Sequence, residues 1–210
     1  TCFDIAAREE AQRKDNKALQ KAHDWYMKEF GDVEGITVPA PDKTTNGNTT
    51  CGEYHHYLTI TSDEFMALCK RLNTSSTAMM YTIFGRLLSV YTGKKDVTFA
   101  SIWHGRHDSD TLRSMMMMVK TLPIRCKYDS NTTIASLAQQ MKQQVTDARA
   151  NDIYSFAEFS NETGITRDVL FAYHGQIRGI PTIDGTELTL LNIGENETGE
   201  QLAISVMLED

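Results

Sequence analysis

The sequence has 210 residues, of which 40% are hydrophobic and 23% are charged, and its formal net charge is −7. These values are typical of a soluble globular chain long enough for one sizeable core. The acidic balance argues against binding to nucleic acid or to anionic membranes. Since no apolar run reaches the length of a membrane span and no signal peptide opens the chain, we expect a cytoplasmic protein.

Cysteine spacing and glycine spacing exclude two further classes of site. The four cysteines, Cys2, Cys51, Cys69 and Cys126, form no C-x-x-C pair and have no histidine at metal-finger spacing, so we expect free thiols and no metal site. Neither G-x-G-x-x-G nor G-x-x-x-x-G-K occurs after an expected strand, so nucleotide binding has no support. Because the first residue is threonine, we expect a piece excised from a longer protein.

The first third of the chain predicts a helix, a loop, a strand and a second helix. Apolar residues recur at helical spacing over Asn16–Phe30, and residues 35–52 are rich in Pro, Thr, Asn and Gly. Alternation over residues 54–60 predicts a strand. Thr61 and Glu64 form a capping box, which predicts that a helix begins at this point.

The remaining two thirds predict further helices and strands in alternation. Residues 76–91 are apolar on nearly every side, which is typical of a buried helix, and Gly93 terminates it. Strands are expected at Asp96–Trp103 and at residues 115–125, followed by an amphipathic helix at residues 134–148 and short strands at 170–173, 187–191 and 201–208. We therefore expect an α/β fold: a layered sandwich with a mixed β-sheet and flanking helices, in one domain spanning residues 1–210.

Two motifs that contain histidine invite a catalytic interpretation. His104 and Asp108 lie in the segment IWHGRHD at the spacing of an HxxxD acyltransferase motif, and a histidine suits general-base chemistry at neutral pH. The same spacing also arises by chance in polar loops. His55 and His56 are followed by no Asp or Gly at the required positions, and on a strand they would point to opposite faces.

Several segments, read in order, resemble the condensation domain of nonribosomal peptide synthetases, specifically its C-terminal half. The best match is Met118-Val-Lys-Thr-Leu-Pro-Ile-Arg125, which resembles FVNTLPLR. Phe3-Asp-Ile-Ala6 resembles the YxDFAVW segment, with Arg8 in place of its Trp. Other matching segments are Trp25-Tyr26, the pair Gly105-Arg106, residues 151–156, residues 167–171 and residues 201–206.

The resemblance implies one lobe of a chloramphenicol acetyltransferase-like fold, in which two lobes form a V around an active-site tunnel. The family's HHxxxDG motif belongs to the N-terminal lobe, so the resemblance implies no catalytic residue within these 210 residues. The whole domain would form an amide bond between thioesters carried on phosphopantetheine arms. The partners that this implies are carrier domains, the missing N-terminal lobe and adjacent synthetase domains, and no cofactor would be bound directly.

The resemblance also assigns roles to the loop after the strand Asp96–Trp103. Arg106 would pair across the lobe interface with the Asp of HHxxxDG, since a guanidinium binds a carboxylate in bidentate fashion. The alternative is a surface arginine at a strand end. His107, Met116, Met118 and Lys120 would contribute to the floor or wall of the tunnel, although a buried strand edge explains the methionines equally well.

Three departures from the family pattern leave other functions open. Met116, Met118 and Lys120 stand where the family has Gly, Phe and Asn, so a degenerate condensation-like domain that recruits a partner is one alternative. A free-standing acyl-CoA acyltransferase that uses His104 is another. A separated lobe would also expose the face that meets its partner lobe, so we expect self-association through that face.

Overall fold

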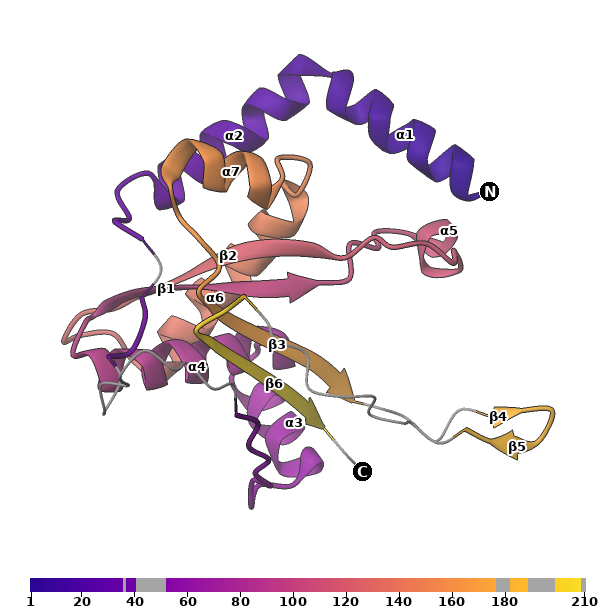
Figure 1. Ribbon diagram of the computed structural model, residues 1–210. Coiled ribbons are helices and arrows are strands. Elements are labelled where there is room, and N and C mark those ends of the chain that lie inside the picture. Colours follow the sequence, from indigo (N-terminus) through magenta and orange to yellow (C-terminus); the bar gives the residue numbers. More distant parts are fainter. Residues whose placement is uncertain (36, 41–51, 177–181, 189–198, 209–210) are drawn as a thin grey trace.

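A four-stranded mixed sheet forms the centre of the computed structural model, which describes residues 1–35, 37–40, 52–176, 182–188 and 199–208. The strand order is β2-β1-β3-β6 (Figure 1), where β1 pairs antiparallel with β2 and parallel with β3, and β3 pairs parallel with β6. The strands are β1 (Asp96–Trp103), β2 (Lys120–Lys127), β3 (Val169–Gln176) and β6 (Leu202–Leu208). A small hairpin, β4 (Thr182–Ile183) and β5 (Thr186–Glu187), projects away from this sheet. The predicted α/β sandwich with a mixed sheet is confirmed.

Strand β1 lies inside the sheet and β2 lies at its edge, and the sequence explains this order. Six of the eight residues of β1 are buried, whereas β2 contains Pro123, which lacks the N–H that a central strand needs. The antiparallel register runs from Asp96 opposite Lys127 to Trp103 opposite Lys120. Lys120 is therefore held directly beside the end of β1, where the loop of interest begins.

Helices α4 (Ser76–Thr92) and α6 (Ile134–Ala150) pack on the sheet, and α3 (Ser62–Arg71) packs on α4. An aromatic cluster joins α4 to the sheet: the ring of Phe84 stacks on Phe171 at 4.4 Å and meets Phe99 edge-on at 4.8 Å. Gly85 allows α4 to approach β2, because a Cβ there would lie 2.5 Å from the Cβ of Cys126. This cluster is the main core of the molecule.

Helices α1 (Cys2–Lys14) and α2 (Asn16–Phe30) form a bent arch beyond the β2 edge, above α7 (Phe156–Thr163) (Figure 1). Asp15 creates the bend, because its extended backbone ends α1 while its side chain accepts hydrogen bonds from the first N–H groups of α2. A second core of Tyr26, Phe30 and Phe159 joins α2 to α7. The sequence predicted neither α1 nor α7 as a helix.

Several predicted elements are confirmed with close boundaries. Helix α2 has the predicted ends, Thr61 and Glu64 form the expected capping box of α3, and Gly93 ends α4 in the left-handed region at φ 68°. The predicted helix beginning at Ile134 is α6. Part of the predicted loop at 35–52 and of the predicted strand at 187–191 lies outside the described residues.

Two predictions of strand structure are wrong. Residues 54–60 form no strand, since all of their side chains are exposed and alternation alone supplies no pairing partner. The strand predicted at 115–125 begins only at Lys120, and Met115 and Met117 are 98% and 84% exposed. Within this range the carbonyl oxygen of Met116, which a strand ladder would require, instead accepts a hydrogen bond from Arg106.

Helix α4 is buried all round at residues 78–82, as predicted, but only on one face from Ile83 onward. Ile83, Leu87 and Val90 are 46%, 46% and 68% exposed, while the opposite face carries the aromatic cluster. Among the described residues, no helix is both long enough and apolar enough to cross a membrane.

Candidate functional site

The loop of residues 104–119, between β1 and β2, gathers most of the predicted site residues and contains the short helix α5 (Ser109–Leu112). Gly105 begins this loop at φ 68° and is buried. A Cβ at this position would lie 1.8 Å from the carbonyl oxygen of Met118. Glycine is therefore required twice, for its positive φ and for the close approach of the two ends of the loop.

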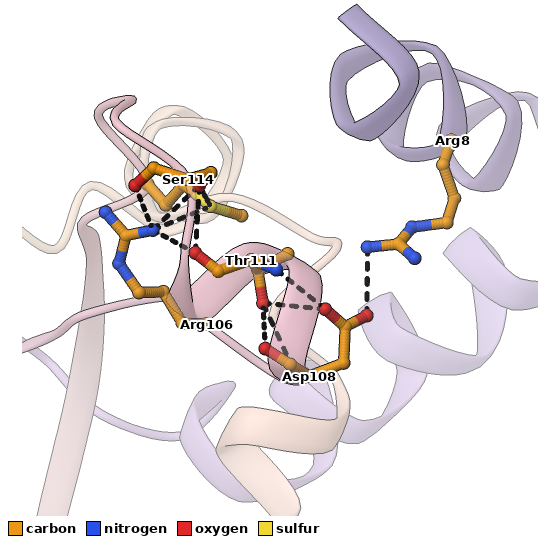
Figure 2. A network of polar contacts seen from close by, with 6 residues as sticks. Arg8, Arg106, Asp108, Thr111 and Ser114 are labelled. Carbon is orange, nitrogen blue, oxygen red and sulfur yellow. Dashed lines mark hydrogen bonds and ion pairs between the residues drawn. The ribbon is translucent and has the colours of Figure 1, made fainter. Parts of the chain in front are cut away.

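Arg106 holds this loop together from inside. Its Nη1 donates to the carbonyl oxygens of Thr111 and Ser114 and to Ser114 Oγ (Figure 2). Its Nη2 donates to the carbonyl oxygen of Met116 at 3.0 Å. A guanidinium carries five donors in a planar fork, so one side chain can satisfy several carbonyl groups. The predicted contact between Arg106 and another lobe stays a prediction, and within this chain Arg106 fixes the shape of the loop.

His104 and Asp108 point to different partners. Nδ1 of His104 accepts a hydrogen bond from the backbone N–H of Arg106 at 3.0 Å. The carboxylate of Asp108 accepts from the backbone N–H and hydroxyl of Thr111, each at 2.9 Å, and pairs with Arg8 of α1 at 2.9 Å (Figure 2). No hydrogen bond joins His104 to Asp108 in the described chain, so Asp108 does not orient this imidazole.

The surroundings of His104 and of Asp108 lower the pKa of both groups, which favours the neutral imidazole and the charged carboxylate. Partial burial, followed by the positive charges of Arg149 and Arg106, lowers the pKa of His104 below its usual value. Hydrogen bonds from Thr111, together with the charge of Arg8, lower the pKa of Asp108. Asp108 acts as the N-cap of α5 and as an anchor for α1.

His107 and Lys120 converge on a carboxylate that the sequence did not indicate. Nε2 of His107 lies 3.0 Å from Oδ2 of Asp152, and Nζ of Lys120 lies 3.4 Å from the same oxygen and 3.1 Å from Glu9 of α1. The side chain of Asp152 is only 7% exposed. The ring of His107 also meets Trp103 edge-on, with 4.6 Å between ring centroids.

A cavity of about 540 Å³ lies between α1 and this loop. Some of the predicted tunnel residues line this cavity and others do not. His107, Met118 and Lys120 line it, together with Asp108 and Asp152. His104 and Met116 are absent from its lining. Of the four methionines at 115–118, Met118 thus lines the cavity, and Met116 contributes its carbonyl group to the bond with Arg106.

Sequence reasoning missed Arg8, Glu9 and Asp152, whose contacts with Asp108 and Lys120 span more than 30 residues of chain. A signal for Arg8 was present, because it replaces the Trp of the YxDFAVW segment with a charge. Asp152 lies directly after α6 in the segment compared with (H/N)QDYPFE, but spacing alone does not indicate which loop it faces.

The comparisons with known proteins agree on one family. The model of the condensation domain family matches residues 4–177. The chain is 27% identical to surfactin synthase subunit 1 of Bacillus subtilis over 163 residues, which is 69% of this chain and 4% of that protein. It is 26% identical to tyrocidine synthase 3 of Brevibacillus parabrevis over 141 residues, which is 63% of this chain and 2% of that protein.

Solved structures show the same fold. The starter condensation domain of a rhizomide synthetase superposes with a TM-score of 0.70 at 18% identity, covering 99% of this chain and 46% of that chain. The epimerization domain from the third module of tyrocidine synthetase B gives a TM-score of 0.70 at 17% identity, covering 99% and 51%. The chain thus spans about half of each of these two structures and a few per cent of the synthetases. On the family model and these relatives, the chain belongs to the condensation domain family.

Proposed function

We propose that these 210 residues form the C-terminal lobe of a nonribosomal peptide synthetase condensation domain, and that the reactive histidine belongs to an N-terminal lobe outside them. The observation that carries the proposal is the combination of near-complete coverage of this chain with only 46% and 51% coverage of two structures of the same fold. The whole domain joins carrier-bound aminoacyl and peptidyl thioesters by forming an amide bond.

In this proposal the chain supplies one wall and part of the floor of the tunnel. The loop of residues 104–119 is preorganised for that role, because Gly105 and Arg106 fix it before any substrate arrives. The phosphopantetheine arms of carrier domains act as substrate tethers, and this chain binds no cofactor of its own. The partners are carrier domains, the N-terminal lobe and adjacent synthetase domains, in the cytoplasm.

The degenerate-domain alternative is not favoured, since two of the three departures from the family pattern take part in contacts that hold the loop and strand β2. Lys120 forms ion pairs with Glu9 and Asp152, and the carbonyl group of Met116 serves Arg106 whatever its side chain. The acyltransferase alternative requires Asp108 to orient His104. Instead, Asp108 is bound to Thr111 and Arg8.

The test compares the parent synthetase with this chain alone. Each is incubated with carrier proteins loaded with two aminoacyl thioesters, and the dipeptidyl thioester is measured by mass spectrometry. We expect product from the parent and none from the chain. Product from the chain alone, or its turnover of any acyl-CoA in a His104-dependent reaction, would contradict the proposal.

The exposed apolar side chains of the loop support the expected self-association. Leu112, Met115, Met117 and Val119 are each more than half exposed, and such a patch favours association. Sedimentation velocity at rising concentration should show dimers of the separate chain. Monomer at every concentration would count against an interface at this loop.

A further inference from the structure

The two histidines of the loop differ in which ring nitrogen takes part in a hydrogen bond. Nδ1 of His104 is used as an acceptor for the backbone N–H of Arg106, so the neutral ring carries its proton on Nε2 and has no free lone pair. His107 has the opposite arrangement. Its Nε2 faces the carboxylate of Asp152 at 3.0 Å, and an ionised carboxylate can only accept a hydrogen bond, so Nε2 carries the proton.

The free nitrogen of His107 is therefore Nδ1. The described chain gives this atom no hydrogen-bond partner, and the His107 side chain is 49% exposed where it lines the cavity beneath α1. The nearly buried Asp152 and the edge-on ring of Trp103 fix the orientation of the imidazole. A histidine that is oriented by a carboxylate and has a free lone pair in a cavity has the geometry of a proton acceptor.

The charges that line this cavity nearly balance, with a small excess of carboxylates. Its fixed charges comprise three cations and four carboxylates, with His107 in addition, and His104 lies close by on the same loop. The lining groups come from α1, α2, the bend between them, the loop, β2 and the segment after α6: Arg8, Glu9, Asp15, Lys21, Asp108, Lys120 and Asp152. A protonated amine thus finds a slightly acidic lining and one free acceptor nitrogen.

We infer that His107, oriented by Asp152, is the residue that accepts a proton from the α-ammonium group of the acceptor substrate. The inference rests on the proposed function, which supplies an aminoacyl thioester as acceptor. The N–H bond of the ammonium breaks and its proton moves to Nδ1 of His107, which leaves a neutral amine with its lone pair and an imidazolium. The carboxylate of Asp152 stabilises that imidazolium through Nε2–H.

The first test uses the chain alone and needs no turnover. Long-range ¹H–¹⁵N correlation spectra of the imidazole rings are recorded while glycine ethyl ester is added as the amine probe. We expect the Nδ1 resonance of His107 to shift with saturation, that of His104 to stay in place, and D152N to weaken the response by about tenfold. Equal shifts in both rings, or no shift at His107, would overturn the inference.

The second test uses the parent synthetase with the carrier-bound thioesters described above. H107Q should lower kcat/KM by ~10²-fold, the lower range for general-base catalysis, and should remove the acidic limb of the pH profile. H55Q is the matched control, because His55 is 77% exposed, pairs with Glu53 and does not line the cavity, and it should retain both rate and profile. Unchanged kcat/KM and pH profile in H107Q would overturn the inference.

A parent synthetase that forms no amide bond would instead count against the proposed function. In that case the spectra would still decide whether His107 recognises the amine.

Discussion

Helices α1 and α4 are held in place by different forces. Helix α4 buries nine residues against the sheet and its neighbours, whereas α1 buries only Ile5. What α1 has instead is a row of ion pairs: Arg8 with Asp108, Glu9 with Lys120, and Arg13 with Glu158. Apolar burial is the dominant stabilising contribution in proteins and partly exposed ion pairs contribute little. Helix α1, which covers the cavity, is therefore held less firmly than α4.

The largest expected effect comes from breaking the aromatic core. Phe99 is fully buried between α4 and β3, so Phe99→Ala should lower the free energy of unfolding by ~3–5 kcal/mol in urea titrations. Phe3→Ala on α1 is the control, because Phe3 is 87% exposed, and it should change stability by less than ~0.5 kcal/mol. Similar losses of unfolding free energy in the two variants would contradict the claim that apolar burial holds α4 but not α1.

The next effect concerns the loop on which α1 rests. Gly105→Ala combines a left-handed backbone with a clash against the carbonyl of Met118, so we expect a loss of about 3 kcal/mol. Gly93→Ala separates the two causes, because Gly93 has the same φ of 68° but nothing within 4 Å of an added Cβ. It should cost only ~1–2 kcal/mol. Equal costs would mean that the loop moves aside without penalty.

A smaller, pH-dependent effect is expected between α2 and α7. Hydrogen bonds to Glu162 and then Asp24 raise the pKa of His23 above its usual 6.5. Because the folded-state pKa is raised, the stabilisation is complete below the unfolded value and disappears as the pH rises through the folded value. The difference in unfolding free energy between wild type and His23→Gln should thus be greatest near pH 5 and shrink above neutrality. A difference that grows with pH would contradict this assignment.

The smallest effect should be the one most sensitive to salt. Arg8→Gln removes the ion pair with Asp108, whose two side chains are 46% and 42% exposed. We expect faster limited proteolysis between α1 and α2 at low ionic strength, and no difference from wild type at about 0.5 M salt, where such charges are screened. The control is Arg113→Gln, because Arg113 is an exposed arginine on the loop that contains Asp108. A difference that persists in high salt would mean that Arg8 acts through packing.

The contrast between the two helices also explains what the sequence could predict. Helices α2 and α4 and strand β1 were predicted because burial imposes a regular apolar pattern on them. Caps marked helix ends as well: Thr61 marks the start of α3, and Gly93 marks the end of α4. Helix α1 was missed because it has almost no buried face and hence no such pattern. The segment at 54–60 has the alternation of a strand but no partner.

The candidate site was predicted in part for the same reason. Motif comparison singled out His107, Met118 and Lys120, and all three line one cavity. Motif comparison could not identify Asp152 or Arg8 as site residues, since their contacts depend on how α6 and α1 are placed in three dimensions. The HxxxD spacing likewise does not show in which direction each side chain points. Only the folded loop shows that His104 and His107 have different hydrogen-bond partners.

The most direct test of the central claim compares two histidines in the parent synthetase. The second histidine of the HHxxxDG motif expected upstream of these residues is replaced by alanine, and His104 is replaced in a separate variant. Formation of the dipeptidyl thioester is then measured for both. The account predicts a loss of at least ~10²-fold for the upstream variant and near-normal product for His104→Ala. Loss of product only in the His104 variant would contradict it.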